Sequence, residues 1–291
     1  LPIAERNNTA LAVAQDGGLF FLERPQPGVS NDPPAERSPN TANLMRFNVE
    51  EKKAKLVKAG ITNFSLSADG KKIAFTSDAG GGDNLWVMNA DGSDAKQISK
   101  EDFRLMSNPA WMPDGNYLVG RKNFTSQRSA GAGEMWQYHI SGGSGVQLTK
   151  RKNDQQDVNE PNISRDGKYL YFSEDMYPGG YFQYNKDPHN EIYVIKRYEF
   201  ETGKLETITG GPGGAARPQV SPDGKKLAFI KRIGTSTVLY LHDLETGEEW
   251  PIFDKLDKDQ QTAWALFGVY PNFSWMPNKI VFNIIKSFEI N

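Results

Sequence analysis

The sequence predicts an all-β fold, a six-bladed β-propeller whose blades are four-stranded antiparallel sheets. One observation is a phrase close to Ser-x-Asp-Gly-Lys, which occurs four times and precedes a short apolar run each time. A second is its spacing, because Asp69, Asp114, Asp166 and Asp223 lie 45, 52 and 57 residues apart. Repeats of this size are typical of blades arranged around an axis.

One blade can be followed along residues 61–99. Aspartate and glycine favour tight turns, because Asp bonds nearby backbone N–H groups and Gly tolerates positive φ. The two middle strands are apolar on both faces, as expected of a sheet packed between two neighbours. The strands are expected at 63–67, 72–77, 85–88 and 96–99, the turns at 69–70 and 89–92, and a glycine-rich loop at 78–83.

The same order recurs at 109–149, 161–209 and 218–253, with a degenerate copy at 10–57. A last unit, 271–290, holds three expected strands. We expect the N-terminal strand to complete it, since this removes two exposed sheet edges. The expected domain is a single propeller over 1–291, with blades at about 10–60, 61–107, 108–159, 160–216, 217–269, and 270–291 together with 1–9.

The connections of such a fold divide between two rims. The tight turns share one rim, which we call the turn rim. The loops between second and third strands and the links between blades share the other, the long-loop rim. Long irregular loops are uncommon unless they are functional or disordered, so a binding site is expected on this rim. The longer connections are 23–43, 78–83, 122–133, 174–190, 150–159 and 254–269.

Charged and aromatic side chains in these connections are the candidate binding residues, because such groups often anchor interfaces. The alternative is that the loops fold over the rim and fill the channel with their own aromatic rings. Both interpretations stay open. The candidates are Arg121, Lys122, Arg128, Tyr181, Tyr184, Lys186, Asp187, Trp264 and Tyr270.

Composition excludes several classes of function. The net charge is −2 and the pI about 6.0, whereas nucleic-acid binders usually carry a basic stripe. No apolar run approaches the roughly 18 residues of a membrane helix, so we expect a soluble monomer without membrane insertion. The chain contains no cysteine, which excludes disulfides and thiol chemistry.

Catalytic motifs are not found. The sequence lacks His-Glu-x-x-His, Gly-x-Ser-x-Gly and Walker patterns, so we expect no catalytic residues, no metal and no cofactor. Asp91 with Asp94 and Asp257 with Asp259 are weak calcium candidates that lack the ligand count of a dedicated loop. His139 and His242 occupy equivalent repeat positions, which favours a packing or surface role.

The blades resemble TolB-type propeller repeats, in which Ser-Pro-Asp-Gly-Lys introduces a strand and Asn-Ala-Asp-Gly-Ser closes a hairpin. Residues 73–282 look like the propeller that precedes the metal-dependent barrel of secreted bacterial amidohydrolase-like proteins. The first blade looks more like a propeller of tricorn-type proteases, so a natural hybrid and an engineered fusion both stay open. The resemblance to the amidohydrolase-like propeller lies in residues 83–93, 121–134, 181–188 and 264–271. The resemblance to the tricorn-type propeller lies in residues 18–25 and 63–71.

These resemblances imply an accessory role. Both parent groups keep their catalytic residues in other domains, so the expected function is a non-catalytic binding or scaffolding propeller of a hydrolase. It would bind or gate a protein or peptide partner, or the substrate of the associated hydrolase, at the long-loop rim. The implied location is periplasmic or secreted in bacteria. Two alternatives stay open, a metal-assisted hydrolase with its site in the channel and a TolB-like envelope adaptor.

Overall fold

A computed structural model describes residues 7–24, 42–102, 109–126, 129–153, 156–175, 193–233, 236–258, 273–276 and 279–282. Every regular element in these ranges is a strand. The strands form five four-stranded antiparallel sheets, here blades 1 to 5, and one two-stranded sheet, β21–β22. No helix in these ranges has the length and apolar content needed to span a bilayer.

The strand bounds follow the repeat. Blade 1 holds β1 (Asn7–Val13), β2 (Leu19–Arg24), β3 (Ala42–Asn48) and β4 (Lys53–Ile61). Blade 2 holds β5 (Asn63–Leu66), β6 (Lys72–Ser77), β7 (Asn84–Asn89) and β8 (Lys96–Gln97). Blade 3 holds β9 (Ala110–Trp111), β10 (Tyr117–Ser126), β11 (Ser129–His139) and β12 (Val146–Gln147).

Blades 4 and 5 keep this order. Blade 4 holds β13 (Val158–Ile163), β14 (Tyr169–Asp175), β15 (Tyr193–Glu199) and β16 (Leu205–Thr209). Blade 5 holds β17 (Ala216–Val220), β18 (Lys226–Ile233), β19 (Ser236–Asp243) and β20 (Glu249–Lys258). The two-stranded sheet holds β21 (Phe273–Met276) and β22 (Lys279–Phe282).

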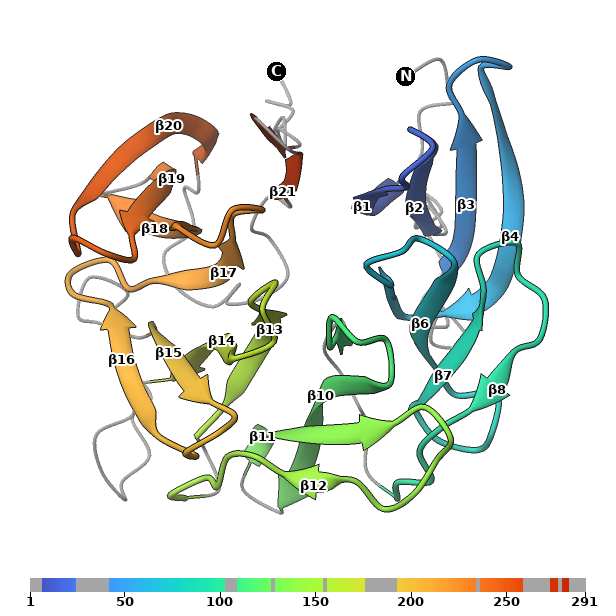
Figure 1. Ribbon diagram of the computed structural model, residues 1–291, viewed down its shortest axis with the longest axis horizontal. Coiled ribbons are helices and arrows are strands. Elements are labelled where there is room, and N and C mark those ends of the chain that lie inside the picture. The colour runs from blue at the N-terminus through green and yellow to red at the C-terminus, as the bar shows by residue number, and fades with distance from the viewer. Residues whose placement is uncertain are drawn as a thin grey trace, which may run out of the picture.

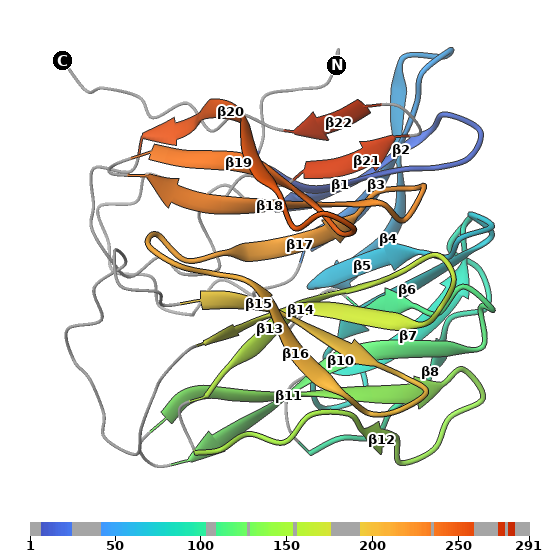
Figure 2. The ribbon, with the colours of Figure 1, turned by 60° about the vertical axis from the view of Figure 1, so that its left-hand side comes forward.

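The sheets stand around a common centre (Figure 1). The first strand of each sheet is innermost, and β4, β8, β12, β16 and β20 lie on the outside. First strands of neighbouring sheets lie close together, and β1 also lies close to β21, so the first and last sheets are neighbours. Seen from the side, the tight turns point in one direction (Figure 2). This is the propeller architecture.

The expectation of six complete blades is wrong, because the described residues form five four-stranded sheets. Residues 7–9, which the sequence predicts in the last blade, instead continue β1 and pair with Leu22, Glu23 and Arg24 of blade 1. A bulge at Ala10, whose φ is 52°, separates this pairing from the remainder of β1. The N-terminal strand therefore belongs to blade 1 and does not complete the last sheet. In the described residues, β21–β22 is two-stranded.

The hydrophobic core lies between blades rather than within one. Ala74, Leu85 and Val87 of blade 2 pack in one cluster with Leu118 and Tyr138 of blade 3. Similar clusters join blade 1 to blade 2, blade 3 to blade 4, blade 4 to blade 5 and blade 5 to β21–β22. Because side chains alternate between the faces of a strand, each blade that lies between two others presents an apolar face to both.

A serine side chain closes the turn in three copies of the repeat phrase. Ser221 Oγ accepts a hydrogen bond from the backbone N–H of Lys226 at 2.9 Å and donates one to Asp223. This hydrogen bond from Ser221 is the main reason why the pKa of Asp223 lies below its usual value. Ser67 and Ser164 make the corresponding contacts.

The segment 122–133 is not an irregular insertion as expected. Residues 117–124 of β10 pair continuously with residues 132–139 of β11, and the pairing resumes at Ser126 and Ser129. Strands β9 and β12 contribute only two residues each to this sheet. The hairpin therefore extends beyond its neighbouring strands toward the long-loop rim, and Arg121 and Lys122 lie on regular strand.

Replacing the turn serine tests this account of the repeat. Ser221→Ala is expected to lower the free energy of unfolding by about 1–2 kcal/mol, because the N–H of Lys226 loses its acceptor. Urea unfolding followed by tryptophan fluorescence measures the change. Ser141→Ala, in an exposed turn of the same rim, is the control and should change stability little. Equal stability of Ser221→Ala and the wild type would contradict the proposed role.

Candidate binding site at the long-loop rim

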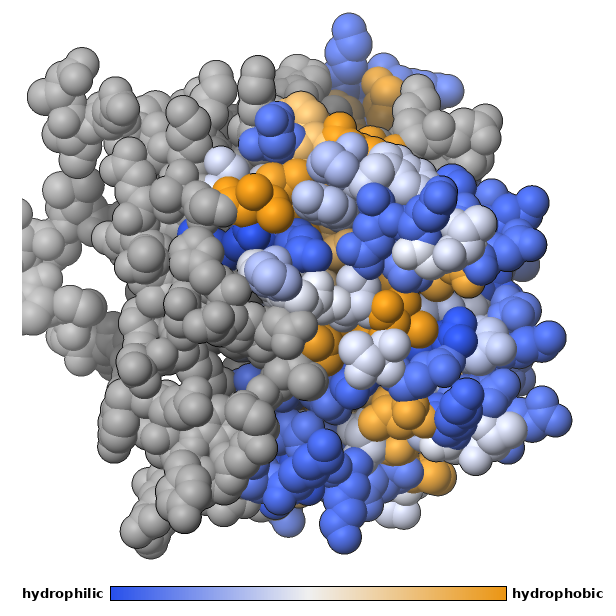
Figure 3. All heavy atoms as spheres, turned by 90° about the vertical axis from the view of Figure 1, so that its left-hand side faces the viewer, coloured by the Kyte–Doolittle hydropathy of each residue, from blue (hydrophilic) through white to orange (hydrophobic). Residues whose placement is uncertain are grey.

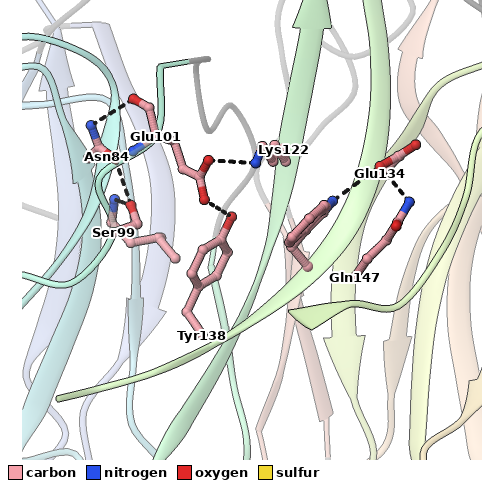
Figure 4. Close-up of polar contacts among 9 residues, drawn as sticks. Asn84, Ser99, Glu101, Lys122, Glu134, Tyr138 and Gln147 are labelled. Carbon is pink, nitrogen blue, oxygen red and sulfur yellow. Dashed lines mark hydrogen bonds and ion pairs between the residues drawn. The ribbon is translucent and has the colours of Figure 1, made fainter. Parts of the chain in front are cut away.

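A group of polar side chains joins blade 2 to blade 3 at the long-loop rim. Glu101 follows β8 in the link between the two blades, and Lys122 lies in the middle of β10. Lys122 Nζ lies 2.6 Å from a carboxylate oxygen of Glu101, and the hydroxyl of Tyr138 donates a hydrogen bond to Glu101 at 3.0 Å. Figure 4 shows both groups pointing at this carboxylate.

Burial and the charge of Glu101 raise the pKa of the Tyr138 hydroxyl, which therefore remains a donor. Lys122 Nζ also lies 4.2 Å from the ring centroid of Trp136. The ammonium group is thus held by a carboxylate and by an aromatic face, which is a favourable setting for a partly buried cation.

The link between the blades is fixed by Asn84 and Ser99 (Figure 4). Asn84 Oδ1 accepts hydrogen bonds from Ser99 Oγ at 2.8 Å and from the backbone N–H of Glu101 at 2.7 Å. Ser99 Oγ accepts the N–H of Leu85 at 2.9 Å. Because both side chains are buried, Glu101 is held at a defined position on the rim.

Glu134 organises the outer side of the same hairpin. Its carboxylate accepts hydrogen bonds from Trp136 Nε1 at 3.2 Å, Gln147 Nε2 at 2.9 Å and Arg151 Nη1 at 3.1 Å. The guanidinium of Arg151 lies 4.0 Å from the ring centroid of Phe124. Glu134 therefore ties together β11, β12 and the link that follows β12.

Arg121 projects from the opposite face of the hairpin, toward blade 4. Its Nε donates to Asp157 Oδ1 at 2.8 Å, and its side chain is only 3% exposed. Burial raises the pKa of Asp157, although the pairing with Arg121 acts in the other direction. On the neighbouring strand β14, burial also raises the pKa of Glu174, whose carboxylate lies 3.6 Å from Lys196 Nζ.

Closer to the axis, Glu160 joins blades 4 and 5. Glu160 and Arg217 both have φ of 58°, and each lies at a bulge and precedes a proline. The carboxylate of Glu160 accepts the Arg217 backbone N–H and its Nε, both at 2.8 Å, and Ser173 Oγ at 2.9 Å. Bulges commonly re-aim side chains in this way.

The candidates from the sequence fall into two groups. Arg121 and Lys122 lie in the inter-blade contacts described above, on opposite faces of β10. The others lie outside the described residues, and their binding roles stay predictions: Arg128, Tyr181, Tyr184, Lys186, Asp187, Trp264 and Tyr270.

Sequence reasoning missed Asp157 and Glu101, which are the partners of Arg121 and Lys122. It also missed Tyr138, which bonds Glu101, and Glu134, which bonds Arg151. A usable signal was present for Glu134, which directly precedes the apolar run that begins at Met135. Spacing along the chain could not pair Arg121 and Lys122 with their partners, because these partners come from other blades.

The weak calcium candidates that can be placed are turn residues. Asp91 accepts hydrogen bonds from the N–H and hydroxyl of Ser93, and Asp94 accepts one from Asn89. Asp259 and the side chain of Asp257 lie outside the described residues. In the part of the chain that the structure describes, no group of three or more His, Cys, Asp or Glu is arranged to hold a metal.

On the side that carries β16 and β20, apolar residues are scattered among hydrophilic ones (Figure 3). Leu205 of β16 and Ile252 of β20 are among the exposed apolar side chains. Isolated apolar residues of this kind are normal on a protein surface and indicate no docking site. This leaves the long-loop rim as the better candidate.

Breaking the Glu101–Lys122 pair should be costly. Lys122→Met is expected to lower the free energy of unfolding by about 3 kcal/mol, because it leaves Glu101 poorly solvated without its cation. Adding Glu101→Gln to this variant should recover much of the loss in a urea-unfolding double-mutant cycle. Lys55→Met, which breaks the exposed pair with Glu51, is the control and should cost less than about 1 kcal/mol. Equal effects of the two lysine substitutions would contradict the assignment.

Glu174 should make stability depend on pH. Its folded-state pKa is raised, so its protonated form is favoured on folding and its contribution is lost as pH rises through the folded pKa. Glu174→Gln is therefore expected to gain stability relative to the wild type as pH rises from below its unfolded pKa toward neutrality. Glu206→Gln should show the opposite trend, because Arg197 lowers the pKa of Glu206. Guanidinium unfolding at several pH values tests both signs.

Comparisons with known proteins agree with the fold. No family model matches the chain. A curated relative, the uncharacterized peptidase YuxL of Bacillus subtilis (strain 168), is 25% identical over 170 residues, which is 56% of this chain and 20% of the relative. The chain thus spans about a fifth of the length of the curated relative it matches.

Two solved structures extend the comparison. A TolB-type protein from Agrobacterium tumefaciens matches with a TM-score of 0.64 and 19% identity, over 86% of this chain and 82% of that one. The tricorn protease matches with a TM-score of 0.59 and 10% identity, over 89% of this chain and 27% of that one. At these identities the likeness shows the fold alone. The predicted resemblance to TolB-type and tricorn-type propellers is confirmed at that level, and the predicted mixture of two origins stays a prediction.

Proposed function

We propose that this chain is a non-catalytic binding and scaffolding propeller, the accessory module of a hydrolase that acts on peptides. It binds or gates a peptide substrate or partner at the long-loop rim. The observation that carries the proposal is the set of fixed polar groups at this rim, which includes Glu101, Lys122, Glu134, Arg121 and Asp157. Contacts between blades hold Glu101, Lys122, Arg121 and Asp157 in place, and Glu134 is held by β11, β12 and the link that follows β12.

A peptide suits such a rim. Peptide chains present N–H and C=O groups at regular intervals together with charged ends, so carboxylates, cations and aromatic faces in fixed positions can recognise them. The likeness of the fold to the tricorn protease, and the sequence similarity to a peptidase of which this chain spans about a fifth, support an accessory role. We include in the proposed binding surface the seven candidates outside the described residues.

A second candidate is a TolB-like envelope adaptor that binds a folded protein. The observation that favours it is the match to the TolB-type protein of Agrobacterium tumefaciens, of which this chain covers 82%. Both roles accord with the proposed periplasmic or secreted location, which rests on the TolB-type resemblance.

A binding and cleavage assay with one probe tests the first proposal. A fluorescein-labelled pool of random hexapeptides is expected to bind the purified chain in fluorescence anisotropy and to stay uncleaved in mass spectrometry. The triple variant Tyr181→Ala, Tyr184→Ala and Trp264→Ala should weaken binding at least about tenfold, which corresponds to 1.4 kcal/mol. Tyr117→Ala, an exposed residue beside the turn rim, is the control and should bind as the wild type does.

Each other outcome has a defined meaning. Cleavage of the peptides by the purified chain would contradict the non-catalytic role. Unchanged binding by the triple variant would contradict the proposed face. Absence of peptide binding would leave the adaptor role as the better account.

A further inference from the structure

The outer edge of blade 1 differs from the outer edges of the other blades. β4 is the last strand of its sheet, and in the part of the chain that the structure describes no further strand pairs with it. Exposed strand edges are commonly kept short or interrupted by proline. β8 and β12 contain two residues each, β16 contains five, and β20 contains Pro251. β4 contains nine residues and no proline, so it is the longest uninterrupted outer strand among those described.

The first half of β4 belongs to a hairpin that extends beyond the body of blade 1 (Figure 1, Figure 2). Residues 48–56 are all exposed to solvent. The hairpin is nevertheless regular, because residues 45–48 pair with residues 53–56. Its turn is fixed by Asn48, whose Oδ1 accepts the backbone N–H of Glu50 at 2.9 Å. The strand is therefore already formed and accessible to a partner.

Blade 2 limits the accessible part of this edge. A Cβ at Gly92, in the second turn of blade 2, would lie 2.6 Å from the carbonyl oxygen of Val57. The backbone of blade 2 thus lies against β4 from Val57 onward. Residues 53–56 precede this contact, and we call them the open edge.

The open edge has a cationic face and an apolar face. Lys55 lies opposite Arg46 on β3, and Leu56 lies opposite Met45. Because side chains alternate along a strand, Lys53 shares the face of Lys55 and Arg46, whereas Leu56 and Met45 lie on the other face. Leu56 is 58% exposed, the second largest value among the exposed large apolar side chains. A strand placed beside the open edge would meet positive charge on one face and an aliphatic side chain on the other.

The positive charge of this face is not neutralised within the described residues. Lys53 makes no ion pair with any of them, and Lys55 reaches only Glu51, at 3.5 Å in an exposed pair. Arg46 is paired with Asp16. Exposed ion pairs contribute little to stability, so both lysines can exchange solvent or Glu51 for a carboxylate of a partner at low cost.

We propose that the open edge of β4 binds an extended segment of a protein partner as an additional strand, and that the residues of this segment alternate between acidic and apolar. Strand addition supplies backbone hydrogen bonds, and the side chains supply specificity. The acidic residues lie beside Lys53 and Lys55 and the apolar ones beside Leu56, since both kinds of cross-strand neighbour are favourable. This surface is separate from the long-loop rim, so the inference goes beyond the proposed function and does not depend on it.

Fluorescence anisotropy with labelled heptapeptides tests the alternation. The peptide Glu-Val-Glu-Val-Glu-Val-Glu is expected to bind the purified chain at least about tenfold more tightly than Glu-Glu-Val-Val-Val-Glu-Glu, a difference of 1.4 kcal/mol. These two peptides have the same composition and charge. Lys-Val-Lys-Val-Lys-Val-Lys should bind at least as weakly as the second, because its charges are repelled.

Two N-methylated forms of the alternating peptide test the backbone pairing. One carries the methyl groups on its valine nitrogens and the other on its glutamate nitrogens. Because alternate N–H groups of a strand point to the same side, one of the two forms should lose binding at least about tenfold.

A double variant with a matched control tests the position of the site. Lys53→Glu with Lys55→Glu should abolish the preference for the alternating peptide and leave the melting temperature nearly unchanged, since both side chains are exposed. Lys204→Glu with Lys225→Glu changes the net charge equally at exposed positions of blades 4 and 5, and it should keep the preference.

Four results would overturn the inference, and each leaves the proposed function of the long-loop rim intact. Equal binding of the two acidic peptides would show attraction by charge alone. Full binding of both methylated forms would exclude strand addition. An unchanged preference of the Lys53→Glu, Lys55→Glu variant would place the contact elsewhere. Absence of binding would show that the lysines only protect the edge from pairing.

Discussion

The packing of each blade against its two neighbours is the constraint on which the structure depends. A four-stranded sheet of this kind cannot bury both faces alone, so its apolar residues reach a core only when the next sheet is present. The clusters that join Leu85 to Leu118, and Val119 to Phe172, are examples. The same geometry explains why the notable polar contacts lie between blades. At the long-loop rim, the apolar contacts between blades are followed by ion pairs. Lys122 pairs with Glu101 after blade 2, and Arg121 pairs with Asp157 before β13 of blade 4.

The recurring elements could be read from the sequence because their causes are local. The Ser-x-Asp-Gly turns follow from contacts within a few residues, as the hydrogen bonds of Ser221 show. The strands that follow these turns could be predicted for the same reason. The number of blades could not, because it depends on which sheet takes residues 7–9. These residues pair with residues 22–24 of blade 1, and the repeat phrase carries no information about that choice.

The sequence predicts the long-loop rim as the place of the candidate site, and it names only some of the polar residues that the structure brings together there. The long-loop rim was expected from the lengths of the connections, and Arg121 and Lys122 were chosen for their charge. Their roles could not be foreseen, since neighbouring residues of a strand face opposite sides and Asp157 and Glu101 come from other parts of the chain.

The bulges at Glu160 and Arg217 also mean that the blades are not interchangeable modules. The backbone N–H of Arg217 points out of its own sheet and donates hydrogen bonds to Glu160 and Ser173 of the preceding blade. Blade 5 therefore carries a donor that fits only a neighbour with these two acceptors. A circularly permuted chain would keep this junction, whereas a chain with blades shuffled or duplicated would bury an N–H group without a partner. Contacts of the innermost strands thus help to determine the order of the blades, independently of the turns that make the repeats look alike.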